Sequence, residues 1–379
     1  MSAPLKTAVS AASAISSATT TTSAFTPRTL FEVSPSITRS YFLGHHAGAL
    51  SSMRKALSNI SLILECRDSR VPLTSTNPLL EHALADRDRV IVYTKSDLCA
   101  PGTSTRWSRR QHELLAAHHA AGKGGARTAV AFTDERDARS VRALLGAVRQ
   151  RAVQQHALTG LRALVVGMPN AGKSTLLNAL RRVGMALPNA ARTGAQPGIT
   201  RKMGSPVRVA PEDSGAGVEG GVFVVDTPGV FVPYVGDVEA MLKLSLVGCV
   251  KDGLVPAETV ADYLLFRLNL RDPGIYAELS APTNDAAEWL ENVAVRTGKL
   301  RKGGVPSLDA AADWVVQQWR KGNLGRFGLD EVSEESLRAR AEREALGAEE
   351  HLSMNQARKR EKENRKVKNA AKRAAAEGG

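Results

Sequence analysis

The stretch Gly167-Met-Pro-Asn-Ala-Gly-Lys-Ser-Thr175 decides how the rest of this sequence is interpreted. It matches the phosphate-loop pattern G-x-x-x-x-G-K-[ST] and lies between an apolar run and a helical pattern, the context that this motif requires. Its glycines let backbone N–H groups surround phosphates, and the following helix adds the positive end of its dipole. Lys173 would reach the β- and γ-phosphates, and Ser174 would bind Mg²⁺. The stretch therefore predicts a nucleotide site with Mg²⁺ as a cofactor.

The sequence around this loop predicts an α/β domain. Short apolar runs at 60–65, 89–93, 161–166 and 221–225 are typical of buried strands. Helical patterns lie between them, at 109–121 and 138–152. Strands that alternate with helices favour a mostly parallel sheet covered on both faces. From 235 to 329 the pattern is helical, which predicts a separate all-α domain.

A second motif, Asp226-Thr-Pro-Gly229, follows the strand expected at 221–225. An aspartate at a strand end can hold Mg²⁺ through water, and the Gly229 N–H can contact a γ-phosphate. A third motif, Thr94-Lys-Ser-Asp97, follows the strand at 89–93. The Asp97 carboxylate can accept hydrogen bonds from guanine N1–H and the 2-amino group, which disfavours an ATPase, while the stem of Lys95 packs along the base. Thr94 stands where the common pattern N-K-x-D has asparagine, and a plain surface turn is the alternative interpretation of this motif.

Composition limits the possible partners. The chain has 379 residues and a formal net charge of +13, a balance typical of proteins that meet nucleic acid or an anionic membrane surface. Aromatic residues make up only 4%, which argues against base-stacking platforms. The three cysteines form no CxxC pair, so neither zinc nor a disulfide framework is indicated. No apolar stretch approaches the roughly 20 residues of a transmembrane segment.

The order of the motifs is informative. An ordinary GTPase has its phosphate loop first and its guanine motif late, whereas here 94–97 precedes 167–174, which precedes 226–229. In this the sequence resembles the circularly permuted GTPases of ribosome assembly, and best the bacterial large-subunit assembly GTPase family with its mitochondrial members. The resemblance covers 41–329 and includes further motifs at 41–46, 68–78 and 197–200.

The resemblance implies an α/β fold: a circularly permuted P-loop (Ras-like) GTPase domain at 41–234, then a small all-α RNA- and ribosome-binding domain at 235–329. Residues 330–379 would be a charged tail, disordered or helical. Its basic part, 358–373, has three interpretations: an RNA-binding extension, solvated disorder or a nuclear-localisation signal. Residues 1–40 are rich in Ser, Thr and Ala and poor in acids, as in a mitochondrial targeting segment, with a plain tail as the alternative.

Residue roles also follow from the resemblance. Thr200 would be the switch I threonine on Mg²⁺ and the γ-phosphate, and Asn170 matches the residue that helps bind K⁺ in potassium-activated relatives. The residue after Gly229 is Val230, where Ras-like proteins carry a water-positioning glutamine. The family's candidate replacement is His45, for which a structural or RNA-contacting role is the alternative. The expected catalytic residues are His45, Lys173 and Thr200; the nucleotide contacts are Thr94, Lys95, Asp97, Asn170, Ala171, Gly172, Lys173, Ser174, Thr175 and Gly229; the metal ligands are Ser174, Thr200 and Asp226.

The expected function is that of a GTPase, slow alone and stimulated by ribosomes. Its GTP form would bind the rRNA of the immature large ribosomal subunit and leave after hydrolysis to GDP. The candidate phosphate contacts are Lys299, Arg301, Lys302, Arg320, Lys321 and Arg326. The expected location is the mitochondrion, on the matrix side of the inner membrane as a peripheral protein. The alternatives are a nucleolar or cytoplasmic assembly GTPase and a nucleotide-dependent scaffold with negligible hydrolysis.

Overall fold

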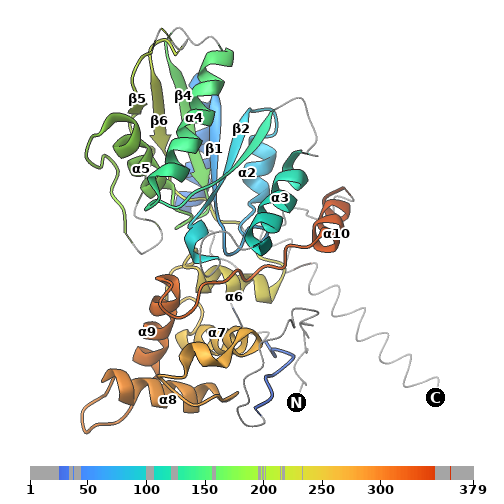
Figure 1. Ribbon diagram of the computed structural model, residues 1–379, viewed down its shortest axis with the longest axis vertical. Helices are drawn as coiled ribbons and strands as arrows, with labels where there is room; N and C mark the ends of the chain where they lie inside the picture. The colour runs from blue at the N-terminus through green and yellow to red at the C-terminus, as the bar shows by residue number, and fades with distance from the viewer. Residues whose placement is uncertain are drawn as a thin grey trace, which may run out of the picture.

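The computed structural model describes residues 25–33, 37, 44–99, 106–120, 127–155, 159–194, 198, 200, 202–213, 215, 218–232, 234–345 and 359. These residues form an α/β domain and a helical domain that lies against the carboxyl ends of its strands (Figure 1). None of the described helices is long and apolar enough to cross a membrane.

A six-stranded sheet in the order β3-β2-β1-β4-β6-β5 forms the centre of the α/β domain. The strands are β1 (Leu62–Asp68), β2 (Arg89–Thr94), β3 (Thr128–Phe132), β4 (Leu161–Gly167), β5 (Val207–Ala210) and β6 (Val222–Asp226). All neighbours are parallel except β5, which runs antiparallel to β6. The mostly parallel α/β fold is thereby confirmed.

The two edge strands, β3 and β5, are not predicted by the sequence analysis. Every residue of β3 is partly exposed, and β5 has only four residues, so neither presents the continuous buried apolar run that marks a central strand. The first strand also lies further along the chain than expected, at 62–68 rather than 60–65.

Helices cover both faces of the sheet (Figure 1). On one face lie α4 (Ala138–Gln155) and α5 (Lys173–Met185). On the other lie α1 (Gly44–Ala56), α2 (Pro78–Ala83), α3 (Arg106–Ala120) and α10 (Glu334–Ala345). The helical domain consists of α6 (Val238–Leu246), α7 (Ala257–Arg271), α8 (Ala286–Thr297) and α9 (Leu308–Arg320).

The core of the helical domain contains large aromatic side chains. Trp289 of α8 is 0% exposed, and its ring lies edge-on to Tyr276 with 5.7 Å between centroids. Trp319 of α9 is also buried and contacts Phe327. Such rings contribute large buried apolar areas, so they hold the four helices together.

We expect Trp289→Ala to lower the free energy of unfolding by about 3–5 kcal/mol, because it would leave a ring-sized cavity in a packed core. Trp314→Ala is the matched control, since Trp314 is only partly buried at the edge of the same core. Urea unfolding of both variants measures the difference. Equal losses would contradict the assignment of Trp289 to the centre of the core.

Residues 25–33 belong to the helical domain, which corrects the boundary expected at residue 40. Phe31 packs edge-on against Tyr263 of α7 with 5.3 Å between ring centroids, and Arg28 forms an ion pair of 2.5 Å with Asp262. The segment runs beside α7 (Figure 1). Its apolar residues are buried only because this contact exists, a tertiary effect that composition does not reveal.

The boundary expected at residue 330 also differs. Asp330 is not the start of a solvated tail: its carboxylate is buried between the two domains. The chain then forms α10, which packs on the α/β domain through Leu337 beside Leu115 of α3 (Figure 1). Arg110 of α3 pairs with Glu334. The acidic composition of 331–350 predicts a solvated segment, so these few apolar contacts are not expected from the sequence.

Candidate functional site

The phosphate loop lies between β4 and α5, at the carboxyl edge of the sheet. A Cβ at Gly167 would lie 2.3 Å from the Cys66 carbonyl oxygen, so only glycine fits there. Asn170 and Gly172 have left-handed backbones, with φ of 55° and 84°. For the non-glycine residue this conformation is strained, and such strain is concentrated at functional sites.

Three oxygen-bearing side chains converge beside the loop. The Ser174 hydroxyl donates to Asp226 Oδ2 at 2.6 Å and lies 3.2 Å from Thr200 Oγ1. Thr200 Oγ1 is 3.5 Å from the same carboxylate oxygen. Asp226 Oδ1 is buried and has no hydrogen-bond partner among the described residues. Hard oxygen donors of this kind suit Mg²⁺, so the three predicted metal ligands fit the ion that the family implies.

Lys173 begins α5 directly after the loop. Its buried ammonium donates to the Met168 carbonyl at 2.7 Å. Burial lowers the pKa of Lys173, and the negative charge of Asp226 opposes that shift. A bound triphosphate would supply further negative charge, which favours the ammonium form that binds it.

The guanine motif lines a neighbouring cavity of about 270 Å³. Asp97 faces it together with Thr133 and Asp134, which follow β3. Burial raises the pKa of Asp97, and the charge of Asp134 raises it further. The cavity borders the phosphate loop at Gly172, so the predicted base site adjoins the predicted phosphate site.

Lys95 and Thr94 tie the guanine motif to the phosphate loop. Lys95 Nζ donates to the Asn170 carbonyl at 2.8 Å and to Asp68 Oδ2 at 2.9 Å. The Thr94 hydroxyl lies 2.9 Å from the Ala171 carbonyl, so it holds the loop. This contact gives a physical role to the residue that departs from the common N-K-x-D pattern.

The helical domain completes the phosphate cavity, which measures about 310 Å³. The residues that it contributes are Val247, Gly248, Gln317, Arg320 and Lys321. The Asn170 amide nitrogen donates to the Gly248 carbonyl at 2.8 Å, which joins the loop to this domain directly. Sequence patterns do not identify these wall residues, because only tertiary packing brings them to the loop.

Arg320 differs from its expected role as an RNA contact. Its side chain is 13% exposed and pairs with Asp252 at 2.9 Å. Its guanidinium also donates to the Ser245 and Leu246 carbonyls, at 2.8 and 2.9 Å, at the end of α6. It therefore stabilises a helix terminus and borders the nucleotide cavities.

His45 and Val230 are the two residues that the sequence analysis relates to positioning of the water in GTP hydrolysis. The backbone of His45 lies in the first turn of α1, whereas its side chain and residues 41–43 lie outside what the structure describes. Val230 is 0% exposed and packs with Ala49 and Met53 of α1. Because its side chain is apolar and buried, Val230 cannot orient a water molecule. The helix that packs against it is α1.

Asp68 and Arg70 lie in the motif at 68–78, to which the sequence analysis assigns no role. The Arg70 guanidinium forms two hydrogen bonds with the Asp68 carboxylate, at 2.8 and 3.0 Å, and lies 4.8 Å from the ring centre of Trp319. Burial alone would raise the pKa of Asp68, but the charges of Arg70 and Lys95 hold that pKa well below its usual range. Arg70 also lines the phosphate cavity.

We expect Asp68→Asn to lower the free energy of unfolding by about 3–5 kcal/mol at neutral pH, because it leaves the Arg70 charge buried and unpaired. The pKa of Asp68 is lower in the folded state, so its stabilisation is complete above the unfolded pKa of about 3.9 and is lost as pH falls below it. Urea unfolding between pH 3 and 7 measures this slope. A variant with the same slope as the wild type would contradict the assignment.

These groups define a class: a P-loop nucleotide-binding protein. Strands β2 and β3, which lead to the predicted base cavity, precede the phosphate-loop strand β4 in the chain. The family profile described as "50S ribosome-binding GTPase" matches residues 162–291. The crystal structure of GNP-bound YlqF from T. maritima aligns with 76% of this chain and 99% of that chain, at a TM-score of 0.47 and 21% identity.

Two named relatives are more similar in sequence. The chain is 38% identical over 311 residues to mitochondrial GTPase 1 of Schizosaccharomyces japonicus, covering 79% of this chain and 92% of that protein. It is 35% identical over 309 residues to mitochondrial ribosome-associated GTPase 1 of Mus musculus, covering 76% and 89%. The chain therefore belongs to the family of ribosome-binding GTPases that includes mitochondrial GTPase 1.

Proposed function

We propose that this chain is a GTP-hydrolysing assembly factor for the mitochondrial large ribosomal subunit, and that its nucleotide state controls binding to and release from rRNA. The observation that carries the proposal is the phosphate cavity, which is built from the phosphate loop on one side and from α9 and Gly248 of the helical domain on the other. Loss of a γ-phosphate there would change contacts with both domains. This is the type of order–disorder or docking switch that GTPases use.

The predicted phosphate and metal residues have the following roles in this scheme. Lys173 would bind the β- and γ-phosphates, and Ser174 and Thr200 would hold Mg²⁺ with Asp226 behind them. The ion would neutralise charge that develops on the phosphates. Gly229, which lines the same cavity, would direct its N–H to the γ-phosphate. K⁺ is proposed as a second cation at Asn170, whose amide group is oriented by Gly248.

The loop between α8 and α9 is the proposed rRNA-binding surface. Lys302 and Arg301 are exposed there, beside Lys299, and phosphate backbones are bound by such groups. Arg326, which follows α9, is also exposed. Arg320 is left out of this surface because its guanidinium is engaged inside the protein.

A mitochondrial location, on the matrix side of the inner membrane, is part of the proposal. It is supported by the mitochondrial relatives and by the Ser- and Thr-rich composition of 1–24. Because residues 25–33 pack on α7, a targeting segment would end before them. Deleting 1–24 should abolish import of a tagged chain; unchanged import would favour the alternative that this is a plain tail.

A scaffold with negligible hydrolysis is the second candidate, and the burial of Val230 favours it. GTP turnover by the full chain, alone and with mitochondrial large subunits, separates the two in K⁺ and in Na⁺ buffer. Stimulation of at least about tenfold by subunits, absent in Lys173→Ala, would support the assembly GTPase. Guanine nucleotide binding without stimulation would favour the scaffold, and stimulation by cytoplasmic subunits alone would favour the nucleolar or cytoplasmic alternative.

A further inference from the structure

The backbone of Val230 is fixed at both of its polar atoms. Its N–H donates to the Gly167 carbonyl at 3.1 Å, and its carbonyl accepts from the Asn77 amide at 2.8 Å. Asn77 is 1% exposed, and its side-chain oxygen accepts from Leu79 N–H at 3.0 Å, which caps α2. One buried side chain therefore holds both a helix start and the segment after Gly229.

The neighbouring Gly229 has little freedom of its own. A Cβ at this position would lie 2.6 Å from backbone atoms of Pro169, so its backbone packs directly on the phosphate loop. Gly229 lines the phosphate cavity, and the Val230 N–H bond to Gly167 fixes the peptide that joins Gly229 to Val230. Asn77 is the side chain that holds the Val230 carbonyl.

The loop that carries Asn77 is stiff. Within it, Ser75 N–H donates to the Val71 carbonyl at 2.8 Å and Thr76 N–H donates to the Leu73 carbonyl at 3.2 Å. The Thr76 hydroxyl also accepts from Arg67 of β1 at 3.0 Å. These hydrogen bonds connect the two ends of the turn, from Val71 to Thr76.

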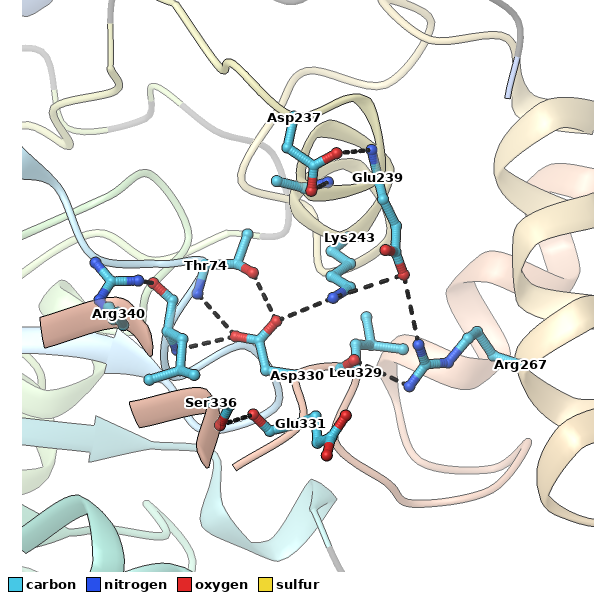
Figure 2. A network of polar contacts seen from close by, with 12 residues as sticks. Thr74, Asp237, Glu239, Lys243, Arg267, Leu329, Asp330, Glu331, Ser336 and Arg340 are labelled. Atoms are coloured by element: carbon cyan, nitrogen blue, oxygen red, sulfur yellow. Dashed lines mark hydrogen bonds and ion pairs between the residues drawn. The ribbon is translucent and has the colours of Figure 1, made fainter. Parts of the chain in front are cut away.

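Asp330 holds the same loop from the helical side (Figure 2). Its carboxylate accepts from Leu73 N–H at 2.9 Å, from Thr74 N–H at 2.7 Å and from the Thr74 hydroxyl at 2.6 Å. Lys243 of α6 lies 3.3 Å from the same carboxylate, whose side chain is 4% exposed. Buried charge-assisted contacts of this kind fix geometry strongly.

We propose that Asn77 is a positioning residue for GTP hydrolysis and that Asp330, by clamping the loop 71–77, lets the docking of the helical domain set the Gly229–Val230 backbone. The proposal rests on the proposed GTPase function. It gives a route by which a subunit that binds the helical domain changes the hydrolysis rate without touching the nucleotide.

The first test compares Asn77→Ser with Asn77→Ala. Serine still caps α2 but is too short to reach the Val230 carbonyl, whereas alanine loses both contacts. We expect each variant to slow single-turnover hydrolysis by about tenfold to a hundredfold, the effect of a small misplacement at a reacting centre. The GDP dissociation constant should change by less than about threefold, because the phosphate loop and guanine motif are untouched. Asn292→Ser is the control, since Asn292 is an exposed α8 amide that donates to the Ser280 hydroxyl.

The second test asks whether Asp330 acts through Asn77. Asp330→Asn and the milder Thr74→Val should each slow hydrolysis, and the double variant Asn77→Ser/Asp330→Asn should be no slower than the slower single variant. Effects that multiply would overturn the relay. An Asn77→Ser protein with the wild-type rate would overturn the positioning role.

A third readout separates this inference from the proposed function. The affinity ratio between a non-hydrolysable GTP analogue and GDP reports the Gly229 contact even without turnover. Asn77→Ser should move that ratio at least about threefold toward GDP, and an unchanged ratio would reject the inference. A wild type that binds both nucleotides but never hydrolyses GTP, with or without subunits, would instead reject the GTPase proposal.

Discussion

Replacing Asp97 with asparagine is expected to weaken GTP binding by about 10³-fold or more and to improve binding of XTP. The Asp97 carboxylate faces the base cavity, where it can accept two hydrogen bonds from guanine. An asparagine amide would place an N–H donor opposite the N–H donor of the guanine 2-amino group. Sites that leave buried polar groups unpaired in this way discriminate against a ligand by a factor of about 10⁴–10⁵. Xanthine offers a carbonyl in place of the 2-amino group, so the new donor has a partner. Fluorescence titration with labelled GTP and XTP measures both constants.

The matched control is Asp134→Asn, in the same cavity. Asp134 raises the pKa of Asp97 through its charge, after the larger effect of burial. Its removal should therefore favour the ionised form of Asp97 and leave the preference for GTP over XTP intact. A loss of GTP affinity in Asp97→Asn without any gain for XTP would point to misfolding of the loop. A base preference that is equal in wild type and Asp97→Asn would contradict guanine reading by this residue.

The sequence predicts which residues meet at this edge of the sheet because local motifs encode them. The phosphate loop, Asp226 and Asp97 each follow a buried strand, and parallel strands bring their carboxyl ends to one edge. The structure accordingly brings Ser174, Thr200 and Asp226 into contact. Their roles toward nucleotide and metal stay predictions until ligand binding is measured.

The parts that sequence reasoning missed depend on contacts between distant segments. Phe31 is buried only because α7 offers Tyr263, and Asp330 only because Thr74 and Lys243 surround it. In the sequence these residues stand in a Ser-rich segment and at the start of an acidic run, so composition predicts that they are exposed. Asn77 likewise carries no local signal for its contact with Val230, which is 153 residues away.

The second large effect is expected for Lys173→Ala, which should reduce GTP hydrolysis by about 10²–10³-fold, the usual result of removing one charge-stabilising donor from a preorganised site. The fold should not suffer. Burial disfavours the Lys173 ammonium, as its lowered pKa indicates, and alanine is a good residue for the first turn of α5.

These two effects together give Lys173→Ala a distinctive signature: the midpoint of thermal unfolding without nucleotide stays equal or rises, while turnover is lost. Lys202→Ala is the control, because Lys202 is an exposed cation close in sequence to Thr200. It should retain turnover within about twofold, since an exposed charge is well screened. Turnover in Lys173→Ala within about threefold of the wild type would show that the phosphate loop is not the hydrolytic site. A large fall in its unfolding midpoint would instead show that the buried ammonium stabilises the loop through Met168.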